Sequence, residues 1–417
     1  MKKNQIYIGF SLVLITLGFA YFKGQVDSKL ALFLITGLMI GYSLQRSRFG
    51  FAGGVRKPVM MGNADFVKAL LVLFSITVVV TAGIHYASTI KGGEIAFRAA
   101  QGASIVPGSQ SVKPATLGLF IGGLLFGIGM IAAGCCASGT LTDIGEGAGR
   151  AIIVLPFFCI GSVLGVWHLA SLEKTFLYEK AITVYLPDHF GYLGSILVSL
   201  FLFLLIYIFI NKYESKRKAE GTYREENYAD WEKEIEKQKD YKFFSKETYH
   251  SFFVKRWSFM TGAIWMAILF IFILVTTNKS WGVTSTFVEW GIWLLSLVGI
   301  NFTNVEALNG AVKIVNNGLL NDPGSLRNIG IIIGAFTCML LAAKCKFNFK
   351  YKLKDIVSYI IAGLMMGYGA RLAGGCNAGA LLGGISNLSL SGWTFLVAMV
   401  IGGLIGIKFV KKCDISI

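Results

Sequence analysis

Long apolar segments recur along the whole chain, and they constrain its fold more than any other feature. A helix needs about 20 mainly apolar residues to cross the hydrocarbon core of a bilayer. Ten stretches approach that length: residues 6–22, 30–46, 66–89, 116–133, 151–170, 192–211, 257–276, 328–343, 356–373 and 391–410. Because backbone groups in lipid must be paired within their own segment, each stretch is predicted to be a helix. The sequence therefore predicts an all-α polytopic membrane protein.

The net charge of +16 is distributed in a way that indicates orientation. In a soluble domain such a charge would suggest a nucleic-acid partner. Here the basic residues gather in short loops beside the apolar stretches, so the expected surroundings are membrane lipid and not nucleic acid. Basic loops of this kind face the cytoplasm. With ten crossings, both termini are then predicted to be cytoplasmic, together with the loops that hold Arg46, Arg48, Arg56, Lys57 and Lys68, and Lys344, Lys346, Lys350, Lys352 and Lys354.

One long polar segment divides the apolar pattern into two halves. Residues 211–256 contain 12 Lys/Arg and 10 Asp/Glu, interleaved at a spacing that favours a solvated cytoplasmic helix. Docking of a partner is the alternative role. The first apolar stretch begins like a signal peptide but lacks a cleavage site, so we expect it to be retained. The predicted organisation is an extra N-terminal span (1–29), a first transmembrane repeat (30–210), a charged linker (211–256) and a second transmembrane repeat (257–417).

An internal repeat links the two halves. Residues 123–141 read GLLFGIGMIAAGCCASGTL and residues 363–381 read GLMMGYGARLAGGCNAGAL, with nine of nineteen positions identical at an offset of 240. In the predicted topology the two copies cross in opposite directions, which indicates inverted-topology repeats. Such repeats place a transport site near the membrane midplane, on discontinuous helices. The alternative is that the glycine rows serve helix packing alone.

Each copy of the repeat is followed by a polar, glycine-rich stretch at membrane depth, residues 137–150 and 377–392. We expect each stretch to form a broken or re-entrant helix whose N-terminus faces the centre and favours an anion. Cys136 and Cys376 would lie at the two breaks, where a thiol offers a soft, polarizable surface to a terminal sulfur atom. The alternative is that both cysteines are small apolar fillers. The neighbouring candidate residues are Gly134, Cys135, Gly139, Gly375, Asn377 and Gly379.

Other polar residues near the repeat are interpreted individually. Arg371 ends a span, and it either attracts the anion or extends to the interface. Glu146 and Arg150 have the spacing of a local ion pair, so they are interpreted as structural. Cys135 has a glycine as its counterpart in the second copy, which favours a filler or secondary role. The four histidines show no partner pattern and are taken as incidental. Because no CxxC occurs, neither a zinc site nor a disulfide framework is predicted.

Three motifs together resemble the YeeE/YedE family of sulfur-transport membrane proteins. They are QRSRFGFAGGVR at 45–56, GLLFGIGMIAAGCCASG at 123–139 and GLMMGYGARLAGGCNAG at 363–379. The resemblance implies thiosulfate uptake across the bacterial inner membrane, with the ligand passed between cysteine thiols, here Cys136 and Cys376. A cytoplasmic sulfur-carrier protein is a frequent associate of the family. The chain departs from the family pattern at Gly50, where the pattern has a cysteine after RF.

The predicted function is therefore that of a permease for a small sulfur-containing anion, most directly thiosulfate, without a cofactor. A transporter of a selenium compound or another reduced sulfur species is an alternative, and sulfide and polysulfide stay open as substrates. A membrane thiol redox enzyme or sulfurtransferase is a second alternative, and it would need an activated cysteine. The sequence separates neither channel from carrier nor one oligomeric state from another.

Overall fold

The long helices agree with the predicted crossings. The structure is a computed structural model that describes residues 3–179, 181–235 and 245–415. Within these residues ten segments are long and apolar enough to cross a membrane, one for each predicted stretch. Their helices are α1 (Lys3–Val26), α2 (Ser28–Ser47), α4 (Asp65–Ile90), α5 (Leu117–Ala132), α7 (Gly149–Leu172), α9 (Leu186–Ala219), α11 (Phe259–Thr277), α14 (Pro323–Leu341), α15 (Leu353–Leu372) and α17 (Leu390–Cys413). The predicted all-α polytopic membrane fold is confirmed.

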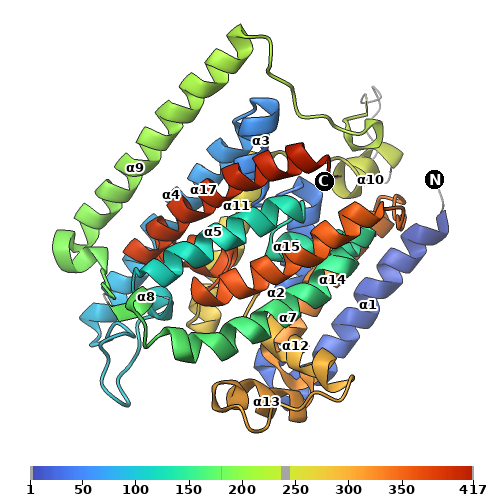
Figure 1. The fold of residues 1–417 in the computed structure, drawn as a ribbon. Coiled ribbons are helices and arrows are strands. Elements are labelled where there is room, and N and C mark those ends of the chain that lie inside the picture. Colours follow the sequence, from blue (N-terminus) through green and yellow to red (C-terminus); the bar gives the residue numbers. More distant parts are fainter. Residues whose placement is uncertain (1–2, 180, 236–244, 416–417) are drawn as a thin grey trace.

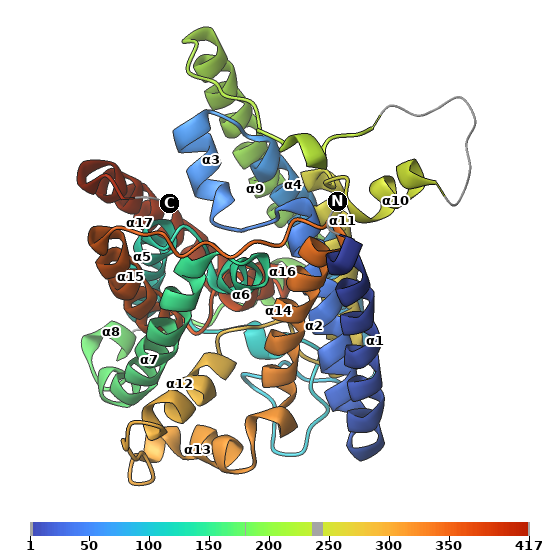
Figure 2. The same ribbon diagram turned by 90° about the vertical axis from the view of Figure 1, so that its right-hand side faces the viewer.

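Shorter helices fill the connections between the crossings. They are α3 (Gly53–Met61), α8 (Phe176–Glu179), α10 (Lys246–Phe253), α12 (Thr286–Ser296) and α13 (Asn309–Asn316), with single 3₁₀ turns at Ser109–Ser111, Asp230–Glu232, Glu306–Leu308 and Leu319–Asn321. The N- and C-terminal ends of the chain and α10 lie toward one end of the bundle, whereas α12 and α13 lie at the other (Figures 1 and 2). We call the first end the linker end and the second the loop end.

Two of the crossings are broken, both at the predicted repeat. After α5 the chain turns and continues as α6 (Ala137–Glu146). After α15 it turns and continues as one π-helical segment, η5 (Asn377–Leu382), followed by α16 (Gly383–Ser386). Figure 2 shows α6 and α16 in the middle of the bundle, surrounded by the long helices. The predicted glycine-rich broken helices are therefore present in both copies.

The two repeats run in opposite directions. A Cβ atom added to Gly122 of α5 would lie 2.6 Å from the carbonyl oxygen of Gly369 in α15. Further along α5, a Cβ atom on Gly129 would lie 2.7 Å from the carbonyl oxygen of Ala362, which comes earlier in α15. The two helices are thus in close antiparallel contact. The other helix contacts follow the same symmetry between the repeats. The contact of α5 with α17 corresponds to that of α15 with α7, and the contact of α2 with α14 corresponds to that of α11 with α4.

Left-handed backbone conformations also occur in pairs. Gly134 (φ 74°) follows α5, and Gly374 (φ 68°) follows α15 at the equivalent position. A left-handed conformation costs other residues about 1–2 kcal/mol, so glycine is favoured at both turns. At the ends of α2 and α11, Arg48 (φ 52°) and Asn278 (φ 55°) adopt the same conformation. These pairs support the division into two repeats, although the exact limits 30–210 and 257–417 stay a prediction.

The linker differs from its predicted structure. The helix α9 extends to Ala219, but residues 222–229 have no regular structure and only a single 3₁₀ turn follows at Asp230–Glu232. The prediction of a continuous helix over 211–256 is therefore wrong at 222–229, while residues 236–244 lie outside the described residues. The physical reason is that Glu226 and Glu232 pair with residues far along the chain instead of with neighbours on a helix. Glu226 pairs with Lys57 and with Arg256, and Glu232 pairs with Arg48.

Candidate substrate site

Cys136 lies at the N-terminus of the helix α6, beside backbone N–H donors of its first turn. It is the N-cap residue, and its sulfur accepts a hydrogen bond from the backbone N–H of Gly139 at 3.4 Å. The Ser138 hydroxyl lies 3.4 Å from the same sulfur, and the backbone amide of Phe51 also approaches it. The side chain is 1% exposed. The first turn of a helix leaves N–H groups without intrahelical partners, so this end of α6 offers donors and a partial positive charge to an anion.

Cys376 occupies the equivalent position in the second repeat. It precedes η5 as the N-cap residue, and the backbone N–H of Ala380 donates to its carbonyl oxygen at 2.7 Å. The equivalent bond from Thr140 to the Cys136 carbonyl oxygen has the same length. Unlike Cys136, Cys376 makes no side-chain capping hydrogen bond, so its thiol is not committed to the backbone of its own helix. The predicted placement of both cysteines at the helix breaks is confirmed.

Asn377 follows Cys376 and faces α5. Its side-chain nitrogen donates to the Met130 sulfur at 3.2 Å, and its side-chain oxygen is buried without a hydrogen-bond partner among the described residues. Because a buried unpaired amide atom costs free energy, this side chain has capacity for a ligand. Two of the neighbouring glycines differ in the space around them: a Cβ on Gly375 would lie 2.8 Å from the Ala380 nitrogen, whereas Gly379 has open space.

A cavity of about 430 Å³ brings together most of the predicted residues of the first repeat. Gly50, Gly134, Cys135, Cys136 and Gly139 all line it. The cavity also contains residues of α2, α3 and the linker, and its charged lining residues are Arg48, Arg56, Lys57, Arg150 and Arg256, with Asp143, Glu146, Glu226 and Glu232. Cys376, Asn377 and Arg371 are not among its lining residues. The structure therefore divides the predicted residues into two groups. Those around Cys136 line a cavity, whereas Cys376, Asn377 and Arg371 lie outside it; we call these the Cys136 side and the Cys376 side.

Gly50 and Cys135 face the same space. A Cβ atom added to Gly50 would meet nothing within 4 Å, so a side chain at this position would extend into the cavity. The Cys135 sulfur lies 3.4 Å from the Thr140 hydroxyl and 3.7 Å from the Ala133 carbonyl oxygen. Cys135 therefore lines the cavity while its thiol has local polar neighbours. The missing family cysteine at residue 50 leaves a real opening next to Cys136.

Arg371 and Lys113 place positive charge beside Cys376. Arg371 points into the protein, since its Nη2 donates to the Thr284 hydroxyl at 2.7 Å and its Nε is buried without a partner among the described residues. Lys113 was not predicted from the sequence; its Nζ donates to the carbonyl oxygen of Gly374. Burial, reinforced by Arg371, lowers the pKa of Lys113 to about 8. A lysine in an inter-span loop gives no sequence signal that distinguishes it from other surface lysines.

The predicted pair between Glu146 and Arg150 is wrong. Arg150 instead binds Asp143 at 2.8 Å, and Glu146 binds Arg48. The physical reason is that α6 ends at Glu146 and Gly147 takes a left-handed conformation (φ 93°), so the helical i,i+4 spacing does not continue to Arg150. All four side chains line the cavity at Cys136.

His85 is more than the incidental residue that the sequence suggested. Its ring is fully buried, with Nδ1 2.8 Å from the Tyr185 hydroxyl and Nε2 3.1 Å from the side-chain oxygen of Asn387. Asn387 caps the C-terminus of α16 and binds Ser280 at 2.8 Å. This network fixes the end of α16 to α4 and α9. No local pattern could reveal it, because the partners are 100 and 302 residues away.

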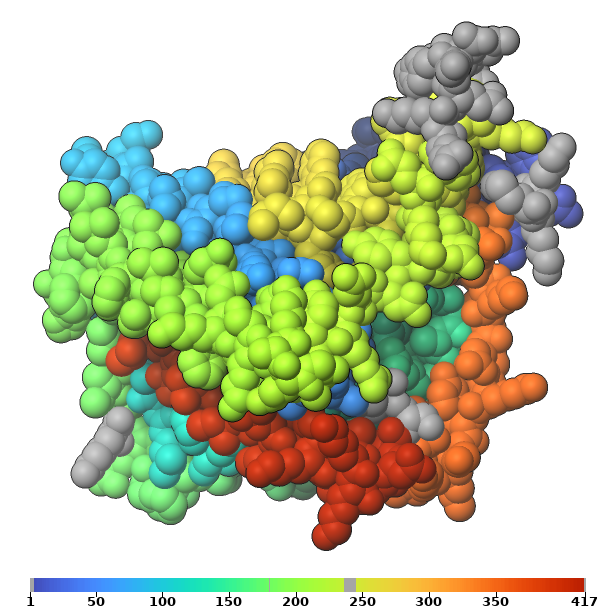
Figure 3. Space-filling model, turned by 90° about the horizontal axis from the view of Figure 1, so that it is seen from above, coloured from blue at the N-terminus to red at the C-terminus, as the bar shows by residue number. Residues whose placement is uncertain are grey.

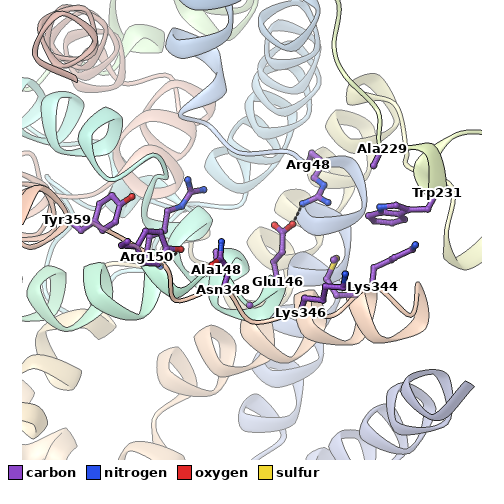
Figure 4. A pocket seen from close by; sticks show the side chains of 13 residues that line it. Arg48, Glu146, Ala148, Arg150, Ala229, Trp231, Lys344, Lys346, Asn348 and Tyr359 are labelled. Atoms are coloured by element: carbon purple, nitrogen blue, oxygen red, sulfur yellow. Dashed lines mark hydrogen bonds and ion pairs between the residues drawn. The ribbon is translucent and has the colours of Figure 1, made fainter. Parts of the chain in front are cut away.

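A second cavity, of about 750 Å³, lies next to the first at the linker end. The two share Arg48, Glu146, Arg150 and Ala229. Figure 4 shows Lys344 and Lys346 on the same side as Glu146, and its dashed line marks the Arg48–Glu146 ion pair. Both residues of this pair line both cavities. Positive side chains in a low-dielectric cleft concentrate anions. Basic side chains therefore line both the cavity at Cys136 and the adjoining cavity at the linker end.

Comparison with known proteins identifies the family. The family described as Sulphur transport matches residues 46–405. The thiosulfate transporter TsuA of Escherichia coli K12 is 24% identical over 378 residues, covering 88% of this chain and 91% of that protein. TsuA of Spirochaeta thermophila is 24% identical over 388 residues, covering 88% and 95%. The probable transporter YedE of Escherichia coli K12 is 32% identical over 162 residues, covering 38% and 39%. The chain is therefore a multi-pass membrane protein that belongs to the sulphur transport family.

Proposed function

We propose that this protein is a permease that imports thiosulfate, or a closely related reduced sulfur anion, across the bacterial inner membrane. The observation that carries the proposal is the pair of cysteines at the N-termini of the two central broken helices, within repeats that run antiparallel. The full-length similarity to two thiosulfate transporters supports the choice of substrate. Membership of a transport family favours a permease over a thiol redox enzyme or sulfurtransferase.

The chemistry of the site suits an anion with a terminal sulfur. Backbone N–H groups and helix dipoles stabilise negative charge, and Arg371 and Lys113 add positive charge on the Cys376 side. Thiols are weak donors and soft surfaces, which match a polarizable sulfur better than the hard oxygens of sulfate. We assign Cys376 with Asn377, Gly375, Gly379, Arg371 and Lys113 to the first contacts, and Cys136 with Cys135, Gly134, Gly139 and Gly50 to the next ones.

The direction of transport follows from the proposed orientation. The basic loops support a cytoplasmic position for the linker end and both termini. In this orientation the anion enters on the Cys376 side and leaves through the cavity at Cys136. The basic second cavity is then the exit, and a cytoplasmic sulfur-carrier protein is a suitable acceptor there. Membrane lipid surrounds the ten crossings.

Gly50 favours a second candidate substrate. The open space beside it would accept an anion larger than thiosulfate, such as a polysulfide or a selenium-containing analogue, where the family pattern has a thiol. Competition experiments separate the two substrates, because the better ligand displaces the other at lower concentration.

Uptake of ³⁵S-thiosulfate into a strain without its own thiosulfate transport tests the proposal. We expect saturable uptake that excess unlabelled thiosulfate abolishes and an equal excess of sulfate leaves largely unchanged. Selenium-containing and polysulfide competitors are measured in parallel. Equal inhibition by sulfate, or no uptake above the empty strain at verified membrane abundance, would contradict the proposed function.

A further inference from the structure

The linker covers the cavity at Cys136. Five of its residues line that space, Glu226, Asn227, Ala229, Glu232 and Arg256. Figure 3, seen from the linker end, shows this segment lying across the face between α11 and α17. Backbone hydrogen bonds hold it at both ends: the Arg224 N–H donates to the Met61 carbonyl oxygen at 2.7 Å, and the Arg256 N–H donates to the Glu232 carbonyl oxygen at 3.0 Å. We call residues 224–232 the strap.

Two of the four carboxylates of the strap, Glu226 and Glu232, pair with three cations of the cavity. Glu226 binds Lys57 and also Arg256, the latter at 3.1 Å. Glu232 binds Arg48 at 3.0 Å, and its other oxygen accepts the backbone N–H of Ala229 at 3.1 Å. Burial opposes ionisation of Glu226, but Lys57 and Arg256 outweigh it and hold its pKa below the usual range. Glu226 is therefore charged at neutral pH in these contacts.

The charges of the cavity do not cancel completely. Asp143 pairs with Arg150, and Glu146 shares Arg48 with the strap. Arg56 makes no hydrogen bond or ion pair with any residue that the structure describes, although it lines the cavity. Burial, together with Arg150, lowers the pKa of Arg56, yet an arginine stays charged at neutral pH. With the strap in place, the cavity has one uncompensated positive charge beside Cys136.

We propose that this cavity is a second anion-binding subsite, on the linker side of Cys136, and that Glu226 and Glu232 occupy it as internal competitors of the transported anion. The inference rests on the proposed function, because it concerns the path of that anion. Two carboxylates carry the charge of one dianion. A dianion that leaves Cys136 binds Arg56 first and then replaces the strap carboxylates at Lys57, Arg48 and Arg256.

The replacement is a release step that needs no covalent chemistry. If the strap stayed and the anion entered, the cavity would hold excess negative charge at low dielectric, which is costly. When the strap leaves, its carboxylates regain water, while the cations keep a counter-ion. An anion of the right charge therefore opens its own exit, and the basic second cavity lies directly beyond it. An uncharged molecule cannot replace the strap in this way.

The test compares the double variant Glu226→Gln/Glu232→Gln with the control Glu225→Gln/Asp230→Asn. The control removes two charges from exposed positions of the same segment that do not line the cavity. Removing an internal competitor strengthens binding of the true ligand, so we expect the apparent KM for thiosulfate to fall about threefold or more in the first variant and to stay unchanged in the control. Arg56→Gln should raise KM, and Arg56→Lys should restore part of the loss.

Hydrogen–deuterium exchange of the strap supplies a second readout that needs no substitution. In the purified wild-type chain, thiosulfate should increase exchange over residues 224–232, and the same concentration of sucrose should not. An unchanged KM in Glu226→Gln/Glu232→Gln, or a strap that exchanges equally with and without thiosulfate in a chain that transports it, would overturn the subsite. Absence of transport by the wild-type chain would instead contradict the proposed function, so the two failures are distinguishable.

Discussion

Lys113 provides a pH-dependent test of the entrance at Cys376. Its ammonium group binds the carbonyl oxygen of Gly374, two residues before Cys376, and burial together with Arg371 lowers its pKa to about 8. Above this pKa Lys113 loses the charge that attracts the anion, so anion binding weakens as the external pH rises. If only the charged form binds, the apparent KM rises up to about tenfold between pH 7 and pH 9.

The assay is ³⁵S-thiosulfate uptake into proteoliposomes at external pH 7, 8 and 9, with the membrane potential clamped and the internal pH fixed. Lys113→Gln should show a high KM that no longer depends on pH in this range. Lys91→Gln is the matched control, because this exposed lysine lies in the same loop. A wild-type KM that stays constant from pH 7 to pH 9, or a Lys113→Gln variant with the wild-type slope, would refute the reasoning.

Three further predictions concern the cavity, the topology and the packing. Cys135→Ala should reduce uptake and Gly50→Cys should restore it, since a thiol at either position would face the same cavity; full uptake by Cys135→Ala would exclude its participation. Alkaline phosphatase fused after residue 230 or 415 should be inactive, and activity at either site would invert the proposed orientation. Gly41→Ala should lower the free energy of unfolding by about 1–3 kcal/mol, because its Cβ would lie 2.0 Å from the Ile331 carbonyl oxygen, whereas Gly83→Ala should not; equal thermal stability of the two would contradict the close α2–α14 contact.

The periodic parts of the fold could be predicted from the sequence because lipid imposes strict rules. Each apolar stretch must be a helix, so ten crossings and the repeat at Cys136 and Cys376 followed from local patterns. The offset of 240 residues also predicted the broken helices at the centre. These features depend only on composition and order along the chain.

The polar contacts could not be predicted in the same way. Glu226, Glu232 and Lys113 bind groups that are 30 to 261 residues away, and no local spacing encodes such pairs. The helix predicted over the linker is absent at 222–229 because Glu226 and Glu232 have distant partners, Lys57, Arg256 and Arg48. Arg150 likewise binds Asp143 across the end of α6, where helical spacing no longer applies. Tertiary ion pairs therefore determine which polar residues surround the two cysteines, and the sequence alone does not predict these pairs.

The most direct test of the central claim is uptake by Cys136→Ser and Cys376→Ser, each at membrane abundance equal to the wild type. Serine keeps a hydrogen-bonding group but removes the soft sulfur, so both variants should fold normally and lose most ³⁵S-thiosulfate uptake. Cys413→Ser, which changes an exposed cysteine, should transport like the wild type. Wild-type uptake by both Cys136→Ser and Cys376→Ser would contradict the account and show that these residues only fill space at the repeat.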